Sequence, residues 1–230
     1  MPNWSVEVEN LARRFGDFVA VDNISFRVRE GQIFGFLGPN GAGKSTTIRM
    51  LAGILEPTSG TGRVAGFDII HERRNIKHVI GYMSQRFSLY EDLTVRENLD
   101  FFGGIYGANS FDWAVEVCRL ESVIDTPCSS LSVGLRQRVA LASAVVHRPR
   151  IVFLDEPTAG VDPASRRSFW ELIYELAHSN VTVFVSTHYM DEAERAIREV
   201  GAHRGLQVIS LREITPSLED IFVSVMTRQR

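Results

Sequence analysis

Alternating apolar and polar residues dominate the first part of the chain and predict short β-strands. The segments WSVEVENL, AVDNISFRV and QIFGFLG show strand character, and turn-forming residues separate them at Phe15-Gly16-Asp17 and Glu30-Gly31-Gln32. Glycine-punctuated strand character returns over residues 57–70, and Val79–Ser84 predicts a further short strand.

Helical spacing dominates the second half, where it alternates with bare apolar runs. The runs Ile151–Leu154 and Val181–Ser186 suit strands buried on both faces. Strands that alternate with helices predict a parallel sheet with right-handed crossovers. A helix is predicted from Thr94 to Gly107 with four apolar residues on one face, namely Val95, Leu99, Phe102 and Ile105. Further helices are predicted over residues 44–52, 111–120, 131–146, 165–178 and 190–200.

Composition narrows the class of protein. The 230 residues are enough for one α/β domain with a core, and a net charge of -3 argues against nucleic-acid binding driven by bulk electrostatics. Two cysteines, Cys118 and Cys128, lack the spacing of a metal site or a disulfide framework, which favours a reducing compartment. We expect neither a signal peptide nor a membrane span, because no apolar stretch approaches about 20 residues.

A glycine-rich stretch, FLGPNGAGKST at residues 36–46, lies between a predicted strand and a predicted helix. It fits G-x-x-x-x-G-K-[ST], in which backbone N–H groups surround a phosphate at a helix N-terminus. Lys44 is expected to reach the β- and γ-phosphates, Ser45 to bind Mg²⁺ and Thr46 to touch the α-phosphate. The alternative is a glycine-rich turn with a chance lysine. The predicted nucleotide-binding residues are Gly38, Pro39, Asn40, Gly41, Ala42, Gly43, Lys44, Ser45 and Thr46.

Two carboxylates follow the apolar run Ile151–Leu154, at the strand end where parallel sheets gather their ligands. Asp155 is suited to hold Mg²⁺, directly or through water, and Glu156 to polarise the attacking water as a general base. An ordinary strand-end pair before a turn at Pro157 is the alternative. Beside the phosphate loop, the two carboxylates predict hydrolysis of a nucleoside triphosphate.

Two further polar residues follow strands at the same predicted edge. His188, in Ser186-Thr187-His188, could donate to the γ-phosphate, although a lone histidine after a strand is more often a surface residue. Gln85, after VIGYMS, could bind Mg²⁺ or the attacking water through its amide. The predicted catalytic residues are Gln85, Glu156 and His188, and the predicted metal ligands are Ser45, Gln85 and Asp155.

Five motifs in a fixed order make the chain resemble the nucleotide-binding subunit of an ATP-binding-cassette (ABC) transporter. They are FLGPNGAGKST, Gln85 within GYMSQRFSLYEDLTVRENL, LSVGLRQRV, IVFLDEPTAGVDP and STHYMDEAE. With PSLEDIFVSV near the C-terminus, the chain is most similar to drug-resistance or ABC-2 type exporters, whose ATPase and membrane subunits are separate chains. The resemblance covers essentially the whole sequence.

The resemblance implies an α/β fold, namely a P-loop NTPase core with a parallel sheet, an antiparallel β subdomain and a small helical subdomain. It implies a single ABC ATPase domain over residues 1–230. The nucleotide-binding core would comprise 1–85 and 131–200, the helical lobe 86–130 and a C-terminal tail 201–230. The implied activity is ATP hydrolysis coupled to transport, with ATP and Mg²⁺ as cofactors.

Roles for four residues come from the resemblance. Phe15 occupies the place of the aromatic that stacks on adenine, with a strand-end core phenylalanine as the alternative. Ser132 and Gly134 match the signature motif, which contacts the γ-phosphate bound by the opposite subunit, and Ser132 also suits a helix N-cap. Asp162 matches the acidic residue of a loop that crosses the dimer interface.

Partners are implied in the same way. Two cassettes, in a homodimer or a heterodimer with a sister cassette, would close around two ATP molecules. An integral membrane permease would bind them at the cytoplasmic face of the cell membrane, and Gln85 lies in the loop that couples the nucleotide to it. No nucleic-acid partner is expected.

Two departures from the family pattern affect these expectations. The usual Leu-Ser-Gly-Gly-Gln signature is altered here, so we expect contacts from Ser132 and Gly134 but not from Val133 and Leu135. The helical lobe is short by about ten residues, nearly three helical turns, and material after Glu194 is also missing relative to the family. The ATP chemistry should be intact despite both departures.

Two other functional classes compete with a transport ATPase. A soluble relative acting on ribosomes or DNA would usually carry two cassettes and basic arms, and this sequence has one cassette and no basic run. A catalytically silent regulatory cassette would suit Val133 and Leu135, but the intact phosphate loop and carboxylate pair argue against it. The sequence does not indicate the transported substrate, because membrane helices determine its selection.

Overall fold

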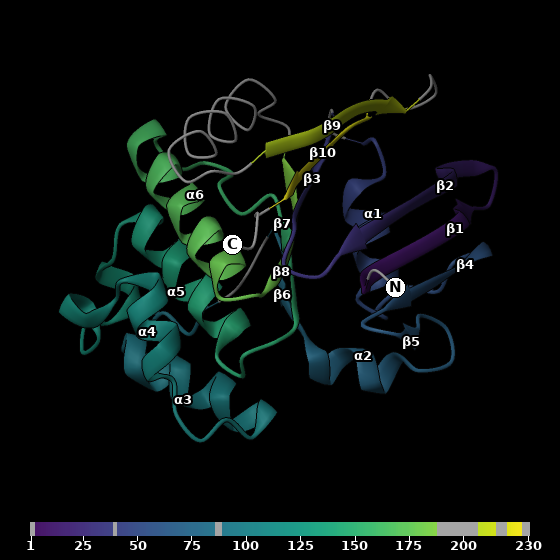
Figure 1. Ribbon diagram of the computed structural model, residues 1–230. Helices are drawn as coiled ribbons and strands as arrows, with labels where there is room; N and C mark the ends of the chain where they lie inside the picture. Colours follow the sequence, from purple (N-terminus) through teal and green to yellow (C-terminus); the bar gives the residue numbers. More distant parts are fainter. Residues whose placement is uncertain (1–2, 39–40, 86–88, 188–206, 215–219, 227–230) are drawn as a thin grey trace.

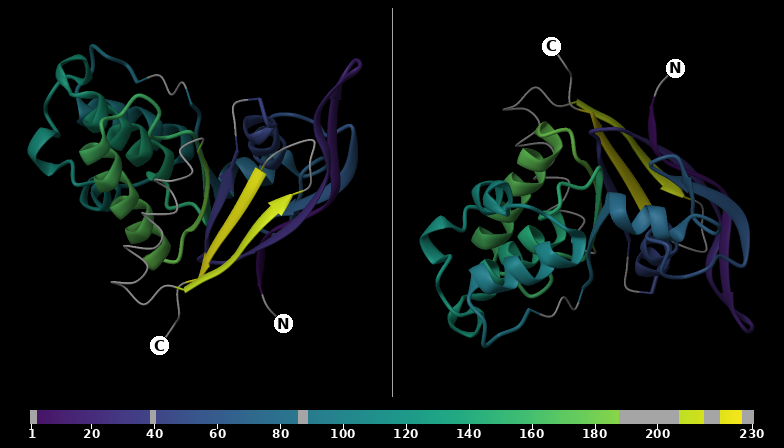
Figure 2. Two further views of the ribbon diagram at one scale, coloured as in Figure 1. Left: turned by 90° about the horizontal axis from the view of Figure 1, so that it is seen from above. Right: turned by 90° about the horizontal axis from the view of Figure 1, so that it is seen from below.

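The computed structural model of the chain describes residues 3–38, 41–85, 89–187, 207–214 and 220–226 (Figure 1). A six-stranded sheet stands between a group of helices on one side and a second, antiparallel sheet on the other. The views from above and below show the same layers (Figure 2).

The central sheet carries the predicted parallel core. Its strands, in spatial order, are β6 (Ile80–Met83), β7 (Ile151–Asp155), β8 (Thr182–Thr187), β3 (Ile33–Leu37), β10 (Asp220–Met226) and β9 (Gln207–Ile214). The first four run parallel, which confirms the prediction from alternating strands and helices. β10 pairs with β3 in the antiparallel direction, and β9 pairs with β10. These last two strands lie where the sequence pattern predicts none.

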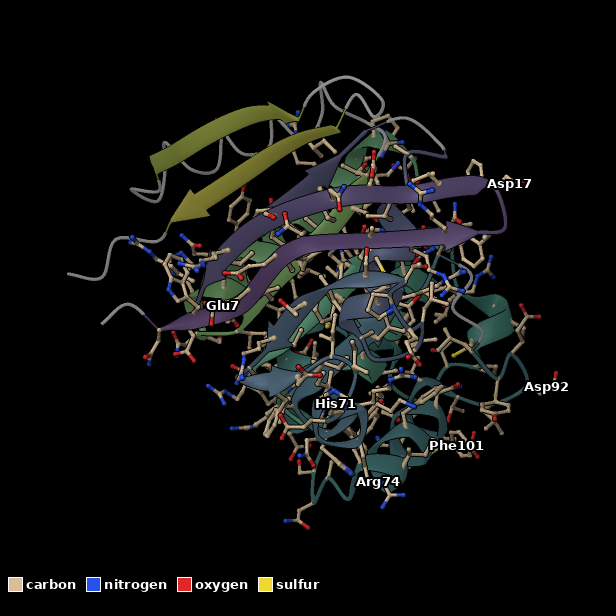
Figure 3. All side chains as sticks on the ribbon, turned by 90° about the vertical axis from the view of Figure 1, so that its right-hand side faces the viewer. Glu7, Asp17, His71, Arg74, Asp92 and Phe101 are labelled. Carbon is tan, nitrogen blue, oxygen red and sulfur yellow. The ribbon has the colours of Figure 1, made fainter. Side chains whose placement is uncertain are left out.

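The second sheet is antiparallel and matches the β subdomain that the resemblance implies. In spatial order it contains β2 (Phe18–Arg29), β1 (Trp4–Phe15), β4 (Ser59–Val64) and β5 (Phe67–Asp68). β1 and β2 form a long hairpin whose last pair is Phe15 with Phe18. Figure 3 shows Asp17 at the tip of this hairpin.

The described residues form six α-helices, and five of them lie where the sequence predicts helices. The exception is the second, which buries only Ile76 and therefore shows no apolar periodicity. The predicted helix over 190–200 lies outside the described residues. The helices are α1 (Lys44–Leu51), α2 (Arg73–Val79), α3 (Val95–Tyr106), α4 (Asp112–Cys118), α5 (Val133–Val145) and α6 (Pro163–His178).

The predicted apolar face of α3 is correct at its start and wrong at its end. Val95 and Leu99 are fully buried, but Ile105 is 61% exposed. The buried face turns instead towards Gly103, where an added Cβ would lie 3.5 Å from Val146, just beyond the end of α5. Since 3.6 residues make a turn, a face through positions 95, 99 and 103 rotates away from position 105.

The central sheet separates two hydrophobic clusters. Val152 and Leu154 of β7 belong to the cluster with α3–α6, whereas Ile151 and Phe153 belong to the cluster with α1 and the antiparallel sheet. Both faces of the parallel strands are thus covered, which explains their continuous apolar runs. The second cluster includes a set of packed rings from Phe26, Phe34, Phe36, Phe153 and Phe184.

Candidate functional site

The loop between β3 and α1 has a backbone that requires glycine. Gly41 and Gly43 have φ values of 89° and 82°, in the left-handed region. A Cβ at Gly43 would lie 2.2 Å from the carbonyl oxygen of Ala20, so a larger residue does not fit there. Gly43 is the N-cap of α1 and has no side chain, so no side chain at that position competes with an anion for the N-terminus of the helix. Pro39 and Asn40 lie outside the described residues.

A cavity of about 330 Å³ opens beside this loop. Segments far apart in the sequence meet there, because the parallel strands deliver their C-terminal ends to one edge of the sheet. The predicted residues Lys44, Ser45, Thr46, Gln85 and Glu156 are brought together in its lining. The full lining is Phe18, Ala20, Gly41, Gly43, Lys44, Ser45, Thr46, Gln85 and Glu156.

Lys44 is buried in this cavity and is only 4% exposed. Its ammonium donates a 2.7 Å hydrogen bond to the Gly38 carbonyl oxygen and lies 3.7 Å from Oε1 of Glu156. A buried cation of this kind suits a ligand with negative charge, since a charge-assisted contact is strong away from water. The Glu156 carboxylate supplies negative charge beside it.

Asp155 ends β7 and is fully buried. Its Oδ1 accepts hydrogen bonds from the Ser45 hydroxyl at 2.8 Å and from the Ser186 hydroxyl at 2.9 Å. Its Oδ2 is buried and has no hydrogen-bond partner among the described residues. A free carboxylate oxygen beside a serine hydroxyl offers the hard oxygen donors that Mg²⁺ prefers, so Ser45 and Asp155 fit the predicted metal ion.

No group of three or more His, Cys, Asp or Glu side chains in the described part of the chain could hold a metal by itself. A Mg²⁺ ion at Asp155 would therefore need ligands from the phosphates and water as well. This is the usual pattern for Mg²⁺ in phosphate-binding sites.

Glu156 has a left-handed backbone conformation, with a φ of 49° that is uncommon for a residue with a side chain. Consecutive side chains of a regular strand point to opposite faces of the sheet. The left-handed backbone at Glu156 breaks this alternation, so that Glu156 lines the cavity that Asp155 borders. Its Oε2 accepts a 2.9 Å hydrogen bond from the Gln85 amide. Two of the three predicted catalytic residues are thus in direct contact.

The sequence prediction missed Ser186, which contacts both carboxylate residues. Ser186 lies opposite Asp155 in the β7–β8 ladder and is fully buried. The backbone N–H of Glu156 donates to its hydroxyl at 3.1 Å and to its carbonyl oxygen at 3.2 Å. A polar residue directly after the apolar run 183–185 was the available signal, but only the strand register reveals its neighbour.

Two aromatic rings stand at the hairpin end near the cavity. Phe15, the predicted adenine contact, is 45% exposed, which is not the burial expected of a core phenylalanine. The Arg13 guanidinium lies 4.5 Å from the centre of its ring. Phe18, which the sequence prediction missed, is 63% exposed and lines the cavity. The role of Phe15 stays a prediction.

The signature residues lie away from the cavity, at the start of α5. The Ser132 hydroxyl accepts a 3.3 Å hydrogen bond from Leu135 N–H and caps the helix, which begins at Val133. Gly134 faces α6 closely, because a Cβ there would lie 2.9 Å from the Ser165 side chain. Neither Ser132 nor Gly134 is among the residues that line the cavity.

Asp162 caps the neighbouring helix α6 and accepts from the backbone N–H groups of Ala164 and Ser165 at 3.1 and 3.0 Å. Hydrogen bonds from the Ser165 side chain and backbone hold the pKa of Asp162 below its usual value. The two helices that carry the predicted interface residues therefore start side by side. His188, the third predicted catalytic residue, lies outside the described residues. No helix in the described ranges is long and apolar enough to span a bilayer.

Comparisons with known proteins agree with the resemblance to ABC transporter subunits. A sequence model of the family described as "ABC transporter" matches residues 21–159. The "Probable multidrug ABC transporter ATP-binding protein YbhF" of Escherichia coli (strain K12) is 46% identical over 211 residues, covering 89% of this chain and 36% of that protein. The "Nod factor export ATP-binding protein I" of Paraburkholderia xenovorans (strain LB400) is 41% identical over 201 residues, covering 85% and 66%. The chain therefore spans about a third of the first relative's length and just under two thirds of the second's.

Solved structures share the fold. The chain cbiO1 from Clostridium perfringens, described as part of the ABC transporter complex cbiONQ, has a TM-score of 0.76 and 28% identity, covering 84% of this chain and 82% of that one. An ATP-binding cassette described as dimeric, in a post-hydrolysis state bound to ADP and Pi, has a TM-score of 0.70 and 26% identity, covering 82% and 90%.

Proposed function

The chain belongs to the ABC transporter family, and we propose that it binds and hydrolyses ATP to power export through a separate membrane subunit. The observation that carries this proposal is that Lys44, Ser45, Gln85 and Glu156 line one cavity, with Asp155 beside it. The names of the two similar relatives, a multidrug transporter protein and a Nod factor export protein, support an exporter.

Nucleotide binding would use the buried cation and the glycine loop. The triphosphate would replace Glu156 as the partner of the Lys44 ammonium, which lies 3.7 Å from that carboxylate. The backbone amides at the start of α1 would take the phosphate oxygens. Thr46, which lines the cavity, would contact the α-phosphate, and Phe15 or Phe18 would stack on the base.

Ser45 and Asp155 would hold Mg²⁺, with Gln85 as a further ligand or as a contact to the attacking water. When bound, the ion neutralises charge that develops on the phosphate oxygens. Glu156 would take a proton from the attacking water, because its carboxylate lines the cavity and its Oε2 is already oriented by the Gln85 amide. We propose His188 as the residue that registers the γ-phosphate.

The signature residues would act on a second cassette's nucleotide. Ser132 and Gly134 lie outside the cavity of their own chain, so they would complete a site only across a two-fold dimer. The solved cassette described as dimeric supports this arrangement. The permease would bind the dimer at the cytoplasmic face of the membrane, near Gln85. The partner cassette would be a second copy or a sister chain.

Dimerisation gives a direct prediction at Val133, which is 44% exposed beside Ser132. In a Glu156→Gln background that blocks hydrolysis, ATP and Mg²⁺ should shift the chain from monomer to dimer in sedimentation, and ADP should not. Adding Val133→Asp should abolish the shift, since a carboxylate next to Ser132 would bring negative charge close to the partner's triphosphate and repel it. The first turn of a helix tolerates an acidic residue, so α5 should remain folded.

Val133→Asn is the matched control, because it has nearly the same size without the charge. This variant should dimerise with ATP to the same extent as the Glu156→Gln chain that keeps Val133. Nucleotide affinity of the monomer should be unchanged in both variants, because Val133 does not line the cavity. Dimerisation of Val133→Asp at unchanged ATP concentration would contradict the trans site.

The proposed function is tested by measuring phosphate release from ATP with the purified chain, with and without Mg²⁺. The same assay is repeated after reconstitution with the membrane protein that co-purifies with it. Mg²⁺-dependent hydrolysis that rises with the membrane protein is the expected result. Nucleotide binding without hydrolysis in either sample would favour the silent regulatory cassette, and failure to bind ATP would exclude both.

A further inference from the structure

The side chain of Ser186 contacts both members of the carboxylate pair. Its hydroxyl donates to Asp155 Oδ1 at 2.9 Å and accepts from the Glu156 backbone N–H at 3.1 Å. Ser186 is fully buried near the C-terminal end of β8. It is not among the residues that line the cavity. A single hydroxyl thus uses its donor on one acidic residue and its acceptor on the next.

The bond to Asp155 decides which carboxylate oxygen is available. Ser45 and Ser186 both donate to Oδ1, and Oδ2 has no partner among the described residues. Rotation of a carboxylate about its last bond has only a broad, two-fold preference. Two hydrogen bonds to Oδ1 fix the rotation of the Asp155 carboxylate, so that Oδ2 would face a metal ion in a defined direction.

The bond to Glu156 holds a strained backbone. The φ of 49° at Glu156 is a conformation that costs on its own and persists where the surroundings hold it. Ser186 accepts from its N–H through both the hydroxyl and the carbonyl oxygen. That conformation is what turns the Glu156 side chain towards Lys44 and Gln85, at 3.7 and 2.9 Å.

We propose that Ser186 is a positioning residue that sets the orientation of both acidic residues of the site, the Asp155 carboxylate for Mg²⁺ and the Glu156 carboxylate for the attacking water. The proposal rests on the ATPase function proposed above. Ser186 acts through its neighbours and does not itself touch the nucleotide, so its loss should spare nucleotide binding and disturb metal use and turnover.

The test compares Ser186→Ala with the wild-type chain in two assays. Affinity for a fluorescent ADP analogue, in EDTA and across a Mg²⁺ titration, reports the metal site without hydrolysis. In EDTA the affinity should stay within twofold of wild type, whereas the Mg²⁺ concentration at half effect should rise about fivefold or more. ATP turnover should give a kcat about tenfold lower at an unchanged KM. Ser186→Thr keeps the hydroxyl and should restore most of both losses.

Ser143→Ala is the matched control. Ser143 is also buried, but its hydroxyl bonds the Val139 carbonyl within α5, away from the site. It should leave the Mg²⁺ midpoint and kcat within twofold of wild type. If Ser186→Ala does not fold, Ser186→Cys, which is close in size and a weaker donor, replaces it.

Three results would overturn the proposal: an unchanged Mg²⁺ midpoint and kcat in Ser186→Ala, equal losses in Ser143→Ala, or a loss of ADP binding in EDTA that indicates a merely structural role. The wild-type assays keep this separate from the proposed function. A wild-type chain that does not hydrolyse ATP refutes the function, whereas an active wild-type chain with an equally active Ser186→Ala refutes only the role of Ser186.

Discussion

Replacing Lys44 with alanine should weaken nucleotide binding by more than tenfold. Lys44 is only 4% exposed, and its ammonium lies in the cavity between the Gly38 carbonyl oxygen and the Glu156 carboxylate. A hydrogen bond to a charged group contributes about 1.5–3 kcal/mol, which corresponds to a loss of ten- to a hundredfold in affinity. The effect should be at the upper end, because the variant also leaves the Glu156 carboxylate facing an incoming triphosphate.

Titration with a fluorescent ATP analogue measures the change. Lys77→Ala is the control, since Lys77 is an exposed lysine on α2 outside the cavity. It removes the same charge from the molecule and should bind ATP as the wild type does. Melting curves of both variants separate lost affinity from lost folding. Wild-type affinity in a folded Lys44→Ala chain would mean that the cavity is not the nucleotide site.

Glu156→Gln should reduce ATP turnover by about 100-fold or more while ATP still binds. Glutamine keeps the shape and can still accept from the Gln85 amide, but it is no base. The contact between Glu156 and Lys44 adds a second expectation. Because the Glu156 carboxylate is 3.7 Å from the Lys44 ammonium, it competes with phosphate for that cation. Removing its charge should therefore raise ADP affinity several-fold.

Phosphate release and ADP binding are measured on the same preparation. ADP is used because it is not hydrolysed, so its affinity does not depend on turnover. Tighter ADP binding in Glu156→Gln would therefore report the loss of the Glu156 charge beside Lys44. Glu116→Gln on the exposed side of α4 is the control and should change neither quantity. Turnover within tenfold of wild type would remove Glu156 as the general base. Unchanged ADP affinity would show that the Lys44–Glu156 contact does not oppose binding.

The parallel core and the phosphate loop could be predicted because each follows from a local rule. β7 and β8 are buried at every position since both faces of the sheet are covered, and each contains an apolar run that marks it. The loop glycines are required by positive φ values at Gly41 and Gly43. Strand ends that meet at one sheet edge also predicted that Asp155 and Glu156 lie beside the phosphate loop, where they contact Ser45 and Lys44 respectively.

What escaped prediction depends on distant parts of the chain. α2 buries a single residue, so no periodicity marks it. β10 joins the sheet by pairing with β3, and β9 joins it by pairing with β10, which no local pattern encodes. Ser186 reads as a strand-end residue until the β7–β8 register places it beside Asp155. Nothing in the sequence was a reason to consider Phe18 beside Phe15 as a ring near the cavity. Phe15 ends β1 and Phe18 begins β2, and the two form the last pair of one hairpin.

The position of β3 in the central sheet has a consequence for how the chain folds during synthesis. β3 leads into the phosphate loop, and its hydrogen-bonding neighbours, β8 and β10, are both made much later. β1 can pair with β2 early, but the hydrogen bond that its Ser5 hydroxyl donates to the Thr182 hydroxyl also waits for β8. On the ribosome, the apolar strand that carries the loop therefore emerges long before anything can pair with it. Nucleotide binding is acquired late, and until then this strand is exposed to aggregation and is a natural target for chaperones.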